Sequence, residues 1–121
     1  MESAPAPRQA AILFADIAGS TRLYETLGDA EALSTITHAL DVIRQVCEEH
    51  GGRVVKTIGD EAMAIFPNAA NAAYASITMQ TQVSGMKTSR GAPLAIHAGF
   101  HYGPVIVDSK DVFGDSVNLA A

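Results

Sequence analysis

The chain has 121 residues, 48% apolar and 17% charged, the size and balance of one soluble globular domain. A chain of this length buries about two-thirds of its unfolded surface, and no apolar run approaches the roughly 20 residues of a membrane helix. A net charge of −5, with no basic stripe, argues against nucleic-acid binding. A bound anion would therefore need a metal ion or a cluster of N–H groups.

The chain is expected to begin with a tail, a buried strand and a short helix. Residues 1–10 contain two prolines and no apolar core of a signal peptide, so we expect a disordered tail. Residues 11–17 form an apolar run that includes Asp16, as in a buried central strand. Ser20 and Thr21 follow a glycine and are expected to cap the short helix.

A longer helix is expected to start at Asp29, as its N-cap, and to end before Gly51. Its apolar residues recur at spacings of three and four along one stripe: Leu33, Ile36, Leu40, Ile43 and Cys47. Because Cys47 is the only cysteine, it cannot form an internal disulfide. We therefore expect a reducing, cytoplasmic compartment.

The next stretch predicts a tight hairpin with charge in unusual places. Two apolar runs, Arg53–Ile58 and Glu61–Phe66, are joined by a turn too short for anything but a hairpin. Lys56 lies inside the first run, and Asp60 lies at the tip beside Glu61. Strand interiors are depleted in Lys and Asp, so this placement indicates a site. Lys56 as a snorkelling lysine on an edge strand is the alternative.

The remaining elements are a third helix, two strands and a last helix. The third helix is expected over 69–86, with a thin stripe of Ala73, Ile77, Gln80, Val83 and Met86. Strands are expected over 94–102 and 105–108, separated by a turn at Gly103-Pro104. His97 and His101 alternate along the first of these strands and are expected to be packing residues, with metal ligation as the alternative.

This element order predicts an α+β sandwich built on a ferredoxin-like βαββαβ unit with an added hairpin strand. The first strand should then lie antiparallel to the second strand of the hairpin, bringing Asp16 beside Asp60. Two carboxylates about 4 Å apart repel by roughly 4 kcal/mol at an effective dielectric near 20. Either one is protonated or a cation lies between them, and oxygen-only ligation favours Mg²⁺ or Mn²⁺.

Gly19, Ser20 and Thr21 lie beside Asp16, where free N–H groups of a helix N-terminus form a phosphate seat. Metal carboxylates next to a phosphate seat indicate metal-assisted phosphoryl chemistry. Taken singly, Asp16 reads as a solvated acid, Asp60 as a turn former and 19–21 as a simple helix cap. Only their joint occurrence favours a site.

Three segments, 14–21, 51–61 and 111–121, resemble the class III adenylate/guanylate cyclase catalytic domain in the right order. The resemblance implies that Asp16 and Asp60 hold two metal ions, with the backbone carbonyl of Ile17 as a further ligand. It also implies residues that bind the nucleotide. These are Gly19, Ser20 and Thr21 for the triphosphate, Lys56 and Asp111 for the purine, and Asn118 for the ribose.

Lys56 with Asp111 matches the pair that reads adenine, whereas guanylate cyclases of this family typically carry Glu and Cys there. The resemblance therefore implies an adenylate cyclase that converts ATP to cyclic AMP in signal transduction. Family members place two sites across a dimer, so a homodimer or a heterodimer with another cyclase domain is expected. No nucleic acid and no membrane segment are expected.

One departure from the family pattern concerns the chain end. The family's transition-state arginine would fall at position 122, one place after Ala121, so residues 11–121 are expected to be an incomplete catalytic domain. Losing one preorganised cation commonly costs about 10²–10³ in rate. The alternative reading is therefore a weak or inactive module for nucleotide binding or dimerisation.

Overall fold

A computed structural model describes residues 8–86, 88, 91, 94–107, 111–114 and 117. The elements, in chain order, are β1 (Arg8–Ala18), α1 (Ser20–Leu27), α2 (Asp29–Glu49), β2 (Arg53–Ile58), β3 (Glu61–Phe66), α3 (Ala69–Ser84), β4 (Ala95–Val107) and β5 (Val112–Phe113). This order confirms the predicted α+β fold. Strand β1 starts three residues earlier than expected.

The strands form one antiparallel sheet in the order β2-β3-β1-β4-β5, with β1 at its centre. The predicted pairing of the first strand with the second strand of the hairpin is confirmed, from Ala11 opposite Phe66 to Asp16 opposite Glu61. On its other side β1 pairs with β4 over its whole length.

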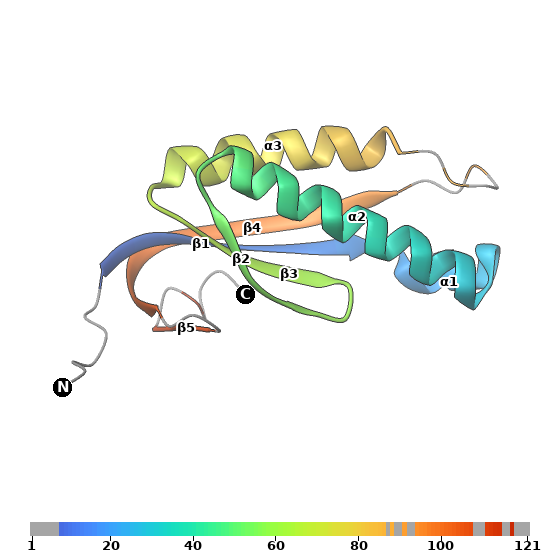
Figure 1. The fold of residues 1–121 in the computed structure, drawn as a ribbon, viewed down its shortest axis with the longest axis horizontal. Helices are drawn as coiled ribbons and strands as arrows, with labels where there is room; N and C mark the ends of the chain where they lie inside the picture. The colour runs from blue at the N-terminus through green and yellow to red at the C-terminus, as the bar shows by residue number, and fades with distance from the viewer. Residues whose placement is uncertain are drawn as a thin grey trace.

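Helices α2 and α3 lie across one face of this sheet (Figure 1). Successive side chains of β1 point to opposite faces. Its odd-numbered residues from Ala11 to Ile17 pack against the helices, while Ala10 and Ile12 join a smaller apolar cluster on the far face. Burial on both faces explains why β1 reads as an unbroken apolar run.

The helical stripes were predicted only in part. Helix α2 buries Ala32, Ile36, Ala39, Ile43, Val46 and Cys47, and α3 buries Ala72, Ala75, Met79 and Val83. The prediction that Leu33 and Ile77 belong to these buried stripes is wrong, because 58% and 63% of their surface is exposed. Alanines therefore occupy part of each buried face, where larger residues were expected.

Two predictions about helix starts are also wrong. Gly19, with φ 74°, precedes α1, and no side chain caps that helix. Gly28 takes the position before α2, so Asp29 is its first helical residue. Glycine reaches these backbone angles without the penalty that a Cβ adds, and here that outweighed side-chain capping.

The predicted turn at Gly103-Pro104 is wrong, because β4 runs straight through it, with Pro104 opposite Gln9. Among the residues that the structure describes, β5 pairs with Ile106 and Val107, and no strand pairs with the outer side of β4 at Pro104. A proline is tolerated on an edge, where its missing N–H removes no ladder bond.

Within the described residues, no helix is long and apolar enough to span a membrane.

We predict that Gly52→Ala destabilises the fold. A Cβ built on Gly52 would lie 2.4 Å from the ring of Phe66, which is buried. Overpacking of this kind costs about 1–3 kcal/mol, measurable as a lower urea midpoint. Gly85→Ala is the matched control, because its Cβ would meet nothing closer than 3.4 Å. Equal stability of the two variants would contradict the packing argument.

Candidate active site

Two acids meet where β1 ends beside the hairpin tip. Asp16 is directly opposite Glu61, and the N–H of Ile17 donates to the backbone carbonyl of Asp60 at 3.1 Å. Gly59, with φ 60°, makes the tight turn that brings Asp60 back toward β1. The predicted meeting of Asp16 and Asp60 is confirmed.

The surroundings of Asp16 disfavour its charged form. Burial raises the pKa of the Asp16 carboxyl, and both the charge of Asp60 and a hydrogen bond with its side chain raise it further. His97 and the Ile17 N–H lower that pKa by smaller amounts. An added cation would relieve the repulsion between the two carboxylates.

The donor set suits a hard divalent cation that keeps ligands of its own. Asp16 and Asp60 offer carboxylate oxygens, and in the described part of the chain no three His, Cys, Asp or Glu side chains are arranged to hold a metal. Mg²⁺ is commonly bound in this way, through one or two carboxylates with water and substrate phosphate oxygens completing the shell. The residues present therefore fit Mg²⁺ or Mn²⁺ bound together with a phosphorylated substrate.

The turn after Asp16 leaves backbone donors near the acids. The first helical bond of α1 runs from the Leu23 N–H to the Gly19 carbonyl at 3.1 Å. The N–H groups before it have no partner within the helix, and the first turn carries no acidic residue. Ser20 and Thr21 open this turn, with Thr21 exposed to solvent. These N–H groups can therefore bind an anion, provided that a cation screens the neighbouring acids.

A second pair of predicted residues, 55 positions apart, also comes together. The Lys56 Nζ donates to the Asp111 carboxylate, and it lies 3.0 Å from each of the two oxygens. Asp111 also accepts from the N–H of Val112 at 2.8 Å. Its pKa is lowered, first by the hydrogen bond from Lys56 and then by that from Val112. Asp111 is therefore a carboxylate at neutral pH.

A β-bulge sets the direction of Lys56. The register of β2 against β3 shifts between Val54, which faces the helices, and Lys56, which is opposite Met63. Met63 is in turn opposite Phe14, two residues from Asp16 on the same face. The extra residue in β2 therefore turns Lys56 away from the helices and onto the face that carries Asp16.

Two further residues adjoin Asp16, and the sequence analysis did not connect them to it. Glu61 and His97 are its direct cross-strand neighbours on β3 and β4 and share its face. The signal that could have found His97 is the pairing of β4 with β1, which was not predicted. Asn118 lies outside the described residues.

The chain is similar in sequence to known proteins over most of its length. The sequence matches the family described as "Adenylate and Guanylate cyclase catalytic domain" over residues 3–121. It is 33% identical to an adenylate cyclase of Streptomyces coelicolor over 94% of the chain and 28% identical to one of Mycobacterium tuberculosis over 93%. The chain spans only 20–29% of the length of the curated relatives it matches.

Solved structures show the same fold. The adenylyl cyclase CyaB of P. aeruginosa superposes with a TM-score of 0.79 at 23% identity, covering 95% of this chain and 70% of that one. A dimeric guanylyl cyclase domain from Blastocladiella emersonii superposes with a TM-score of 0.83 at 20% identity, covering 95% and 72%. At these identities the likeness establishes the fold alone.

We predict that Asp60→Asn stabilises the chain at pH 7. Because the pKa of Asp16 is raised above 3.8 in the folded state, its contribution to stability is present at low pH and is lost as the pH rises through the folded pKa. Removing the charge of Asp60 should restore about 0.5–1 kcal/mol at pH 7, since the site is partly solvated.

At acid pH, where Asp16 is protonated and no repulsion is left to relieve, the gain should vanish. Urea unfolding at the two pH values measures the difference. Asp41→Asn, which removes an exposed acid from α2, is the control and should give no comparable gain. A gain of equal size at both pH values would show that repulsion is not its cause.

Proposed function

Because this chain belongs to the adenylate and guanylate cyclase catalytic domain family, we propose that it converts ATP to 3′,5′-cyclic AMP and pyrophosphate at a site shared between two cyclase domains. The observation that carries the proposal is the meeting of Asp16 and Asp60 beside the N-terminus of α1. Relatives named adenylate cyclase support it.

The residues would divide the work by chemistry. Two Mg²⁺ or Mn²⁺ ions, when bound, supply the positive charge that activates the ribose 3′-hydroxyl and stabilises the leaving pyrophosphate. Asp16 and Asp60 would hold these ions, helped by the carbonyl of Ile17. The N–H groups at Gly19, Ser20 and Thr21 would bind the triphosphate.

The ion pair on the same sheet face would read the base. Lys56 would donate to adenine N1 and Asp111 would accept from the 6-amino group, so each keeps the charge it has in the pair. The bulge in β2 supports this role, because it is what places Lys56 on that face. Asn118 would position the ribose for in-line attack.

We propose further that the partner is a second cyclase domain, either a copy of this chain or another member of the family. One protomer would supply the metal carboxylates, and the other would supply the Lys56–Asp111 pair. Family membership supports a paired arrangement, and one structural neighbour is described as a non-canonical dimeric guanylyl cyclase domain. Cytoplasmic signalling remains the expected setting.

We predict that Asp16→Asn and Asp60→Asn each lower cyclic AMP formation from ATP and Mn²⁺ by at least about 100-fold, because each removes a carboxylate from the metal site. Mn²⁺ binding, followed by electron paramagnetic resonance without ATP, should weaken in parallel. Asp41→Asn should change neither measurement, because Asp41 lies exposed on α2.

Mixing variants tests the shared site. Asp60→Asn and Lys56→Met are each expected to be inactive, but a mixed dimer carries one intact site, so activity should recover to about a quarter of wild type. If the mixture does not recover activity, the proposal that two protomers share one site is contradicted. If the unmutated chain binds ATP and forms no cyclic AMP, the alternative of a module that only binds nucleotide is favoured. Activity that survives Asp60→Asn would contradict the metal assignment.

We predict that Lys56→Glu combined with Asp111→Cys lowers kcat/KM for ATP by at least about tenfold and admits GTP, because the donor and acceptor that match adenine are removed. Cyclic AMP and cyclic GMP measured side by side report the preference. Lys56→Met alone should lose ATP use without gaining GTP use. An unchanged preference in the double variant would contradict the role of the pair.

A further inference from the structure

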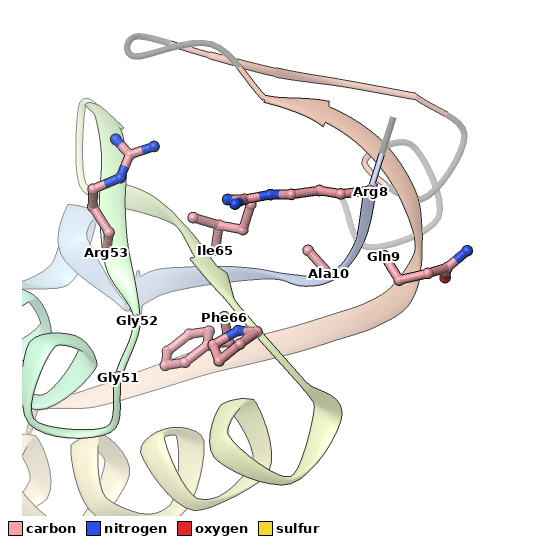
Figure 2. Close-up of a pocket in the computed structure, with 9 residues that line it drawn as sticks. Arg8, Gln9, Ala10, Gly51, Gly52, Arg53, Ile65 and Phe66 are labelled. Atoms are coloured by element: carbon pink, nitrogen blue, oxygen red, sulfur yellow. The ribbon is translucent and has the colours of Figure 1, made fainter. Parts of the chain in front are cut away.

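A pocket of about 310 Å³ lies at the end of the sheet opposite the acidic pair (Figure 2). It forms because β3 ends at Phe66, opposite Ala11, while β1 continues back to Arg8. Arg8 and Asp16 are eight positions apart on β1, which is about 26 Å along an extended strand. The pocket is therefore separate from the candidate active site.

Two arginines line this pocket from the same face of the sheet. Arg53 is opposite Ile65, Ile65 is opposite Ile12, and Arg8 shares the face of Ile12 because it is four residues away on the same strand. Figure 2 shows the Arg8 side chain extended from β1 toward Ile65, on the side where Arg53 stands. No acidic residue is among the described residues that line the pocket.

Recognition of a ligand here falls to the guanidinium groups. The N–H groups of Gly51 and Gly52 already donate to Glu48 and Cys47 carbonyls at 3.1 and 2.8 Å. Arg53 also interacts with another group of the chain, and a guanidinium carries five N–H donors in all. Part of the remaining lining is apolar, and it includes Ala10 and Ile65, which are nearly inaccessible to solvent.

We propose that this pocket binds a phosphate dianion, either free or as a phosphate monoester. Two guanidiniums match its charge of about −2 at neutral pH, and each can offer two parallel N–H donors to phosphate oxygens. A monocarboxylate carries half that charge and only one pair of acceptor oxygens. In a chain of net charge −5, two arginines on one pocket create a local preference for anions.

The test is a titration of the ¹⁵N-labelled chain with inorganic phosphate at constant ionic strength, followed by amide chemical shifts. Amides of Ala10, Gly52 and Arg53 should move together and saturate. The double variant Arg8→Gln/Arg53→Gln should weaken this binding at least tenfold, while Arg44→Gln, which removes an exposed arginine from α2, should not. A dispersed spectrum of the double variant shows that it is folded.

Further arms separate the possible ligands. Tighter binding of glycerol phosphate than of inorganic phosphate would assign the pocket to a phosphate monoester, and equal affinity would assign it to free phosphate. Acetate binding as tight as phosphate would overturn the proposal. So would shifts confined to residues 19–21, or saturation that persists in the double variant.

Discussion

The register between β1 and β3 is the constraint on which the candidate site depends. Strand β1 is buried on both faces, so slipping it by one residue would exchange its two sets of apolar side chains and disrupt both clusters. The core therefore holds Asp16 opposite Glu61 and next to Asp60, although their charges repel. Apolar burial far from the hairpin tip fixes an arrangement that the local electrostatics oppose.

The two charged pairs on this face differ in a way that suits different tasks. Lys56 and Asp111 neutralise each other, and because both side chains remain exposed to solvent, screening by water keeps the contribution of their pair to stability small. Asp16 and Asp60 are both acids, and their proximity disfavours the charged form of Asp16, so the pair is stabilised by added positive charge. The first pair is neutralised within the chain, whereas the repulsion in the second is relieved only by an added cation or proton.

Local patterns predicted the hairpin, the central strand and, through topology, the contact between Asp16 and Asp60. The Lys56–Asp111 pair came only from family resemblance, since nothing local joins residues 55 positions apart. Leu33 and Ile77 were misplaced because alanine satisfies the helical period as well as a larger residue does. Neither His97 nor the pocket at Arg8 could be foreseen, because both depend on the lengths and partners of the strands.

The bulge in β2 has a consequence for how this segment can vary. Side chains alternate between the two faces along β2, except at the bulge. There two consecutive residues, Val55 and Lys56, both lie on the face away from the helices. A substitution at Lys56 changes the head group and leaves the direction of the side chain unchanged. Deleting Val55, the extra residue, would instead remove the bulge and leave Lys56 opposite Met63 on the same face, so the bulge lets this strand hold one more residue without changing the direction of Lys56.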